Sequence, residues 1–124
     1  MDTRKRILIV DDELVIRKLV TESLLGSYEV FVLSSDRHFM DTVEDIKPDL
    51  VILDVRLPGL SGIQLCRHLR GQRRFAGIPV LFLSALTRDV DAIAGFNAGG
   101  NSYLGKPFDV GTLRQTVEAL TSNA

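Results

Sequence analysis

Five short apolar runs along the chain lack the alternation of apolar and polar residues that marks a half-exposed strand. ILIV at 7–10 and LVIL at 50–53 are the clearest of them, and a segment with helical periodicity follows each run. Strands that are apolar on both faces are buried on both faces, which is typical of a parallel sheet covered by helices. The alternation of runs and helical segments therefore predicts an α/β domain with helices on both faces of a parallel sheet.

The boundaries of these elements follow from the apolar runs and the residues that interrupt them. The predicted strands comprise residues 6–10, 29–33, 50–53, 80–83 and 102–104. The predicted helices comprise residues 13–25, a segment ending near 46, and residues 63–70, 89–98 and 110–120. Ser34, Ser35 and Asp36 are candidate caps for the second helix, because their side chains can accept hydrogen bonds from free N–H groups.

Acidic residues stand at the ends of two of the apolar runs. Asp11 and Asp12 follow the first run, and Asp54 follows the third. Because the carboxyl ends of parallel strands meet at one edge of a sheet, we expect the three carboxylates to converge on one crevice. Carboxylates packed closely raise one another's proton affinity unless a cation lies among them, so the cluster predicts a divalent metal, a shared proton, or both.

Two further polar residues follow strands at the same edge. Ser84 comes after VLFL, and Lys106 comes after SYLG and before Pro107. A lysine facing one carboxylate would make only a salt bridge. A hydroxyl and two more acids beside that pair suit a phosphoryl group carried together with a metal ion.

Each residue type suits one part of such a site. The Asp54 carboxylate can attack phosphorus and form an acyl phosphate. A metal ion held by Asp12 and Asp54, with Asp11 ordering its waters, would cancel the repulsion between this nucleophile and an anionic donor. Lys106 would pair with a phosphoryl oxygen. Ser84 would hydrogen-bond that oxygen only after the group arrives, which is the difference between two states that a switch requires.

Plainer roles are open to the same residues. Asp54 could cap a turn, and Asp11 or Asp12 could cap the first helix, since acids favour helix starts. Taken alone, Lys106 would be a solvated lysine and Ser84 would be uninformative.

Length, net charge and cysteine content of the protein limit the number of domains, the partners and the cellular location that we expect. Its 124 residues suffice for one domain, and a formal net charge of -1 gives no electrostatic case for nucleic acid or an anionic membrane. No apolar stretch approaches the roughly 20 residues that span a bilayer, and the N-terminus does not resemble a signal peptide, so we expect a cytoplasmic location.

The single cysteine, Cys66, excludes an internal disulfide and is expected in the core, whereas His38 and His68 are expected on the surface.

Four stretches in the same order carry a resemblance to a known family: ILIVDDE, DLVILDVRLPGLSG, IPVLFLSA and NSYLGKPF. The chain resembles the receiver domain of bacterial two-component response regulators, of the chemotaxis-regulator kind, over essentially its whole length. The resemblance implies a doubly wound, five-stranded parallel sheet of order 2-1-3-4-5, a flavodoxin-like (βα)5 fold. It also implies that residues 1–124 form a single receiver domain with no output domain.

The resemblance assigns roles to the acids. Asp54 would accept a phosphoryl group from a histidine kinase or a histidine phosphotransfer protein. Asp11, Asp12, Asp54 and the backbone carbonyl of Arg56 would bind Mg²⁺, with Mn²⁺ as a substitute.

The resemblance also assigns the partners of the phosphoryl group. Ser84 and Lys106 would hold it, and Tyr103 would turn inward when Ser84 moves. An aromatic residue on a short edge strand is otherwise part of the core. Lys106–Pro107 resembles the family's cis peptide bond, although the sequence itself shows only that a proline permits one.

Some positions are particular to this chain. Arg56 and Leu86 lie two residues after Asp54 and Ser84, at positions that in this family tune the lifetime of the acyl phosphate. Bulky side chains there would hinder the approach of water, so we expect a long-lived phosphoryl group. The segment 99–102, GGNS, replaces acidic residues common in the family and predicts a more flexible, less charged loop.

Leu14 and Val15 fall outside the inward apolar stripe of the first helix, which is drawn through residues 16, 19, 20 and 24. Two apolar side chains near the acid pocket are then left exposed, and we expect them to help dock the phosphodonor. The alternative is that they fold under a neighbouring loop.

These expectations describe a phosphorylation-dependent signalling switch and not an enzyme, apart from self-catalysed phosphorylation from small donors and slow loss of the group. One alternative is a degenerate receiver that only binds proteins. Another is a phosphatase of the haloacid dehalogenase type, although DDELV lacks that family's D-x-D spacing.

The switch would act on a partner protein or a fused output domain, without direct contact to nucleic acid or membrane. A phosphorylation-dependent homodimer would use the face formed by residues 89–98, 102–104 and 110–120.

Overall fold

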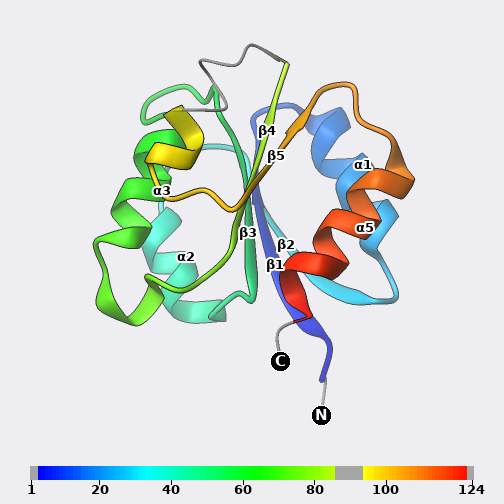
Figure 1. Cartoon of the computed structure of the whole chain (residues 1–124), viewed down its shortest axis with the longest axis horizontal. Helices are drawn as coiled ribbons and strands as arrows, with labels where there is room; N and C mark the ends of the chain where they lie inside the picture. Colours follow the sequence, from blue (N-terminus) through cyan, green and yellow to red (C-terminus); the bar gives the residue numbers. More distant parts are fainter. Residues whose placement is uncertain (1–2, 86–93, 123–124) are drawn as a thin grey trace.

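A parallel sheet forms the centre of the protein, seen here in a computed structural model that describes residues 3–85 and 94–122 (Figure 1). Its five strands lie in the order β2-β1-β3-β4-β5, and every neighbouring pair is parallel. The strands are β1 Lys5–Val10, β2 Tyr28–Leu33, β3 Leu50–Asp54, β4 Val80–Ser84 and β5 Ser102–Gly105. The doubly wound sheet and its strand order are therefore as predicted.

Helices cover both faces of this sheet. In Figure 1, α1 and α5 lie on one side, and α2 and α3 lie on the other. The helices are α1 Leu14–Leu24, α2 Phe39–Ile46, α3 Gly62–Arg70 and α5 Val110–Thr121, with a short 3-10 turn, η1, at Arg73–Phe75. Residues 94–97 are also helical and belong to the helix predicted at 89–98, whose first five residues lie outside the described part of the chain. None of the helices in the described ranges has the length and apolarity needed to cross a membrane.

The buried side chains form two layers, one on each face of the sheet. Leu8 and Val10 of β1 belong to the cluster on the side of α2 and α3, whereas Ile7 and Ile9 belong to the cluster on the side of α1 and α5. Each such side chain contributes about 1.5–3 kcal/mol through its removal from water. A strand with both faces buried gains this free energy at every position, which explains the unbroken apolar runs.

The start of α2 differs from the sequence expectation. The helix begins at Phe39 after His38, which has a φ of 63° and gives no side-chain cap. Ser34, Ser35 and Asp36 therefore do not cap it, and the prediction is wrong. Instead, the backbone carbonyl of Asp36 accepts a hydrogen bond from the Phe39 N–H in a turn that precedes the helix.

The loop before β5 is tied more firmly than its glycines suggest. Arg70, at the end of α3, donates from Nε and Nη2 to the carbonyl of Gly99. Asn101 Oδ1 accepts hydrogen bonds from Arg70 Nη2 and from the Val80 N–H. Side-chain and backbone bonds thus hold the segment that was expected to be loose.

The start of α3 fixes the backbone below the carboxyl end of β3. Ser61 and Gln64 form a capping box, in which each side chain accepts a hydrogen bond from the other's backbone N–H. Gly62 is packed so closely that a Cβ atom there would lie 2.1 Å from the Asp54 carbonyl oxygen. Only glycine fits this position, and the end of β3 is held against the first turn of α3.

Candidate functional site

Four acidic side chains meet at the carboxyl edge of the sheet. Asp11 follows β1 and Asp54 ends β3, and because these strands are neighbours both residues are buried at one point of the edge. One carboxylate oxygen from each of Asp11, Asp12, Glu13 and Asp54 lies within 4.8 Å of the others. The crevice of three converging acids is thus present, with Glu13 as a fourth member.

Short backbone turns orient the two buried acids. Asp11 Oδ1 accepts a hydrogen bond of 2.8 Å from the Glu13 N–H, and Asp54 Oδ1 accepts one of 3.1 Å from the Arg56 N–H. The N-cap of α1 is Glu13, without a side-chain cap, so Asp11 stabilises the turn before the helix. In both acids the Oδ1 atom serves this turn and the Oδ2 atom faces Lys106.

Lys106 brings a positive charge into this crevice. Its Nζ lies 2.8 Å from Asp11 Oδ2, 2.8 Å from Glu13 Oε1 and 3.2 Å from Asp54 Oδ2. The side chain is only 7% exposed. Its backbone N–H donates to the Ser84 carbonyl at 2.7 Å, and the Lys106–Pro107 peptide bond is cis. The end of β5 therefore carries the lysine back over the ends of β1 and β3.

The charges of this cluster shift the proton affinity of its members. Burial, followed by the charge of Asp11, raises the pKa of Asp54 from its usual 3.8 to about 6, although Lys106 and the Arg56 N–H act in the opposite direction. Burial by itself lowers the pKa of Lys106. Contacts with the Asp11 and Glu13 carboxylates and the charge of Asp54 outweigh burial and raise that pKa above its usual value, so the ammonium stays charged.

The donor set at this edge fits a hard divalent cation. Asp11 Oδ2 is buried and receives no hydrogen bond of good geometry within residues 3–85 and 94–122, although the Lys106 ammonium stands at ion-pair distance. Asp12 is exposed, so an ion can reach the cluster from solvent. Carboxylate oxygens of this number and spacing are the ligands that Mg²⁺ accepts in proteins.

The other predicted phosphate partners lie on the strands next to the acids. Ser84 is buried at the end of β4 and faces Gly105 in the register with β5. Tyr103 lies one strand further from Asp54, is partly buried, and packs against the core cluster on the side of α2 and α3. Asp54 and Ser84 are the last residues of their strands and not the first residues beyond them, a difference of one residue from the predicted boundaries.

Three of the residues predicted to tune the lifetime of the acyl phosphate or to dock the donor are exposed, namely Arg56, Leu14 and Val15. Arg56 is exposed, whereas Leu86 falls outside the described part of the chain. Leu14 and Val15 are 58% and 74% exposed, so they do not fold under a neighbouring loop. Cys66 is buried and its thiol lies 3.4 Å from the Ala98 carbonyl oxygen, as expected for a core residue.

Glu13 is the site residue that sequence reasoning missed. The sequence places it directly after the acid pair, at the predicted first residue of a helix. Its contact with Lys106 joins residues 93 positions apart, and only the fold reveals such a contact. The signal available in the sequence was a third consecutive acid at the end of a buried strand.

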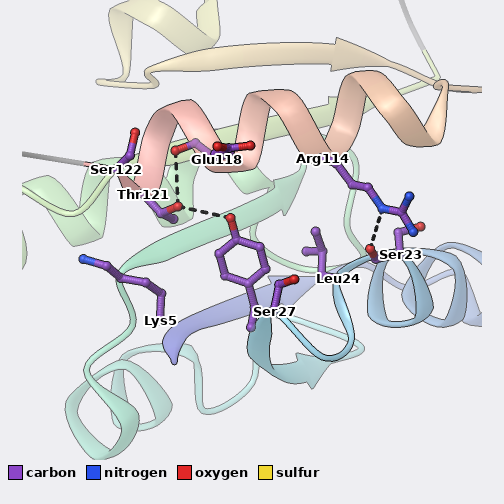
Figure 2. A pocket seen from close by; sticks show the side chains of 9 residues that line it. Lys5, Ser23, Leu24, Ser27, Arg114, Glu118, Thr121 and Ser122 are labelled. Atoms are coloured by element: carbon purple, nitrogen blue, oxygen red, sulfur yellow. Dashed lines mark hydrogen bonds between the residues drawn. The ribbon is translucent and has the colours of Figure 1, made fainter. Parts of the chain in front are cut away.

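A separate hollow of about 500 Å³ lies at the opposite edge of the sheet (Figure 2). It is formed where β1 and β2 begin and where α1 and α5 end, and Tyr28 is one of the residues that line it. Tyr28 and Thr121 place their hydroxyl oxygens 3.4 Å apart, and Arg114 Nε donates to the Ser23 carbonyl. These contacts join α5 to α1 and β2, and none involves the acid cluster.

Comparisons with known proteins agree with this geometry. Residues 7–118 match the model of the response regulator receiver domain. The DNA-binding response regulator MtrA of Mycobacterium tuberculosis is 39% identical over 110 residues, which cover 87% of this chain and 47% of MtrA. The DNA-binding dual master transcriptional regulator RpaA of Synechocystis is 40% identical over 116 residues, covering 93% of this chain and 48% of RpaA. The chain thus spans about half the length of these curated relatives.

A solved structure matches along its whole length. The crystal structure of a putative response regulator from Chloroflexus aurantiacus superimposes with a TM-score of 0.93 at 34% identity, covering 98% of this chain and 100% of that one.

The raised pKa of Asp54 makes the stability of the metal-free protein depend on pH. The pKa of Asp54 is about 6 in the folded protein, and its usual value is 3.8. The protonated carboxyl therefore stabilises the folded state fully below pH 3.8, and this stabilisation is lost as pH rises through 6. We therefore expect Asp54→Asn to increase the free energy of unfolding by about 1–3 kcal/mol at pH 7.5, and by much less near pH 4. Urea denaturation without divalent ions measures both values. Asp45→Asn, at an exposed position of α2, is the control, and a wild type more stable than Asp54→Asn at pH 7.5 would contradict the expectation.

Proposed function

The chain belongs to the response regulator receiver family, and from this premise we propose that it is a phosphorylation-controlled signalling switch in which Asp54 accepts the phosphoryl group. One observation carries the proposal. Asp54 is a buried carboxylate at the centre of an acid crevice, with one oxygen fixed by the Arg56 N–H and the other 3.2 Å from the Lys106 ammonium. The family assignment replaces the alternative of a phosphatase of the haloacid dehalogenase type.

The chemistry follows from the state of Asp54. With a pKa of about 6, most of its carboxylate is ionised above pH 7 and is available as a nucleophile. A carboxylate oxygen attacks phosphorus and forms the new P–O bond of an acyl phosphate. The bond from phosphorus to the donor breaks, and the donor leaves with that electron pair, as the histidine of a kinase or phosphotransfer protein or as acetate from acetyl phosphate.

Magnesium belongs to this proposal. Asp11, Asp12, Asp54 and the Arg56 carbonyl would hold it, and Mn²⁺ could take the same place. Bound there, the ion would reduce the repulsion between the carboxylate and an anionic donor. The acid cluster supports this assignment through its oxygen donors and through the Asp11 oxygen that lacks a hydrogen bond.

The response to phosphorylation would begin at Lys106 and Ser84. Lys106 already stands beside Asp54, and Ser84 ends the neighbouring strand β4. In our proposal both bind the phosphoryl oxygens, and Tyr103 turns inward as Ser84 moves. The protein would catalyse no reaction on a separate substrate, beyond its own phosphorylation and slow dephosphorylation in the cytoplasm.

In our proposal, a partner protein or another domain carries out the response to phosphorylation. The relatives named above are DNA-binding regulators, and only about half of each matches this chain. We propose that residues 1–124 control an output domain or partner protein and do not themselves contact nucleic acid. A phosphorylation-dependent homodimer through β5, α5 and the helix preceding β5 is part of the same proposal.

Intact-protein mass spectrometry after incubation with acetyl phosphate and Mg²⁺ tests the phosphoacceptor. We expect one added phosphoryl group on the wild type, none on Asp54→Asn, and loss of the adduct on treatment with hydroxylamine. After removal of the donor the adduct should persist for minutes, because the bulky Arg56 at the rim hinders water. An adduct on both proteins would refute Asp54 as acceptor, and none on either would favour a receiver that only binds proteins.

Leu14 and Val15 are proposed to dock the protein donor. They lie on the first turn of α1, next to the acids, and Leu14 lines an apolar hollow of about 300 Å³ between α1 and Val32 of β2. Exposed apolar side chains beside a reactive pocket favour a protein contact.

Replacing Leu14 and Val15 together by serine should slow transfer from a phosphorylated histidine phosphotransfer protein about tenfold or more, because docking area is lost. Phosphorylation by acetyl phosphate should not change. Leu25→Ser is the control, since this leucine is 70% exposed at the far end of α1. Equal slowing with both donors, or the same effect from Leu25→Ser, would count against docking.

A further inference from the structure

Glu13 lies at the mouth of the acid crevice and binds the lysine there. Its Oε1 atom accepts a hydrogen bond of 2.8 Å from Lys106 Nζ. This distance is shorter than the 3.2 Å between the same nitrogen and Asp54 Oδ2. In the absence of a phosphoryl group, the lysine is therefore shared between the proposed phosphoacceptor and a residue to which no role has been assigned.

Three carboxylates surround the ammonium group of the lysine. Those of Glu13 and Asp54 accept hydrogen bonds from Lys106 Nζ, and that of Asp11 stands 2.8 Å away at ion-pair distance. A phosphoryl oxygen therefore has to compete with these carboxylates for the charge of the ammonium. The arrival of the phosphoryl group is thus an exchange of partners at this nitrogen.

Glu13 is the carboxylate that can leave most easily. The side chains of Asp11 and Asp54 are 0% and 6% exposed and are fixed at the ends of neighbouring strands. The side chain of Glu13 is 56% exposed, so water can solvate its carboxylate once the contact is broken. Ion pairs with an exposed partner are the weaker ones, because solvent competes for both charges.

We propose that Glu13 is a positioning residue that competes with the incoming phosphoryl group for Lys106 and thereby slows phosphorylation of Asp54. The inference rests on the proposed function of Asp54 as phosphoacceptor and deepens it. Glu13 holds the ammonium toward the rim of the crevice until a donor displaces it. Without the Glu13 carboxylate, Lys106 keeps only Asp11 and Asp54 as partners, and the phosphoryl group has one competitor fewer.

The rate of phosphorylation by acetyl phosphate, at fixed Mg²⁺ and a donor concentration well below saturation, tests this competition. Glu13→Gln keeps the size of the side chain and removes its charge, and it should raise the rate roughly threefold to fivefold, as expected for the loss of an exposed ion pair. Glu118→Gln, an exposed glutamate on α5, makes the same change in net charge and should leave the rate unchanged. A rate for Glu13→Gln equal to or below that of the wild type would overturn the inference.

The same substitution in a Lys106→Ala background separates competition for the lysine from simple repulsion of the donor. If Glu13 acts through Lys106, Glu13→Gln should lose its effect there, because the two residues form a coupled pair. An equally large effect in both backgrounds would assign the change to repulsion and overturn the inference. A wild type that takes up no phosphoryl group would instead overturn the proposed function together with this inference.

Magnesium binding supplies a second readout. Glu13 lies close enough to the acid cluster to be a metal ligand. By calorimetric titration with Mg²⁺, Glu13→Gln should bind within about threefold of the wild type if Glu13 serves the lysine, whereas Asp12→Asn should lose most of its affinity. A loss in Glu13→Gln as large as that in Asp12→Asn would make Glu13 a metal ligand and overturn its role as competitor.

Discussion

The ammonium group of Lys106 is the interaction on which the carboxyl edge of the sheet depends. The fold ends β1 and β3 side by side, and each brings a buried carboxylate to the same point. Burial of the Asp54 carboxylate, followed by repulsion from the charge of Asp11, raises the pKa of Asp54. Lys106, which the end of β5 places over this edge, offsets part of the repulsion between the carboxylates. A divalent cation or a proton would offset the remainder.

Such a site is well suited to switching, because its stability changes with what occupies it. With only Lys106 present, an ionised Asp54 is costly, and a metal ion would remove much of that cost. In our proposal, phosphorylation changes the set of partners again, since Lys106 must turn from carboxylates to phosphoryl oxygens and Ser84 gains a new acceptor. The backbone around Asp54 has little freedom to yield, because Gly62 is packed against its carbonyl and the Arg56 N–H holds its side chain. In our proposal, the adjustment to phosphorylation therefore takes place in β4 and β5, which carry Ser84 and Tyr103.

Much of this arrangement can be predicted from the sequence, because it follows from local pattern and chain order. Runs that are apolar on both faces identify the strands, and parallel strands bring Asp11, Asp54, Ser84 and Lys106 to one edge. What depends on contacts distant in sequence could not be predicted. The bond between Glu13 and Lys106 requires a side-chain conformation across the crevice, and the clamp of Arg70 on the Gly99 carbonyl requires α3 to end beside that loop. The left-handed backbone of His38 before α2 was not predicted, because the serines and the aspartate at 34–36 are better capping residues than histidine.

The titration of Asp54 itself tests the account most directly. Carbon-13 NMR of the side-chain carboxyl groups, with Asp54→Asn to assign the signal, gives its pKa in the metal-free protein. We expect a midpoint near pH 6, which moves downward when Mg²⁺ is added, because a nearby cation favours the ionised form. A midpoint near pH 4 that does not respond to Mg²⁺ would mean that Asp54 is neither crowded by its neighbours nor part of a metal site, and would contradict the account.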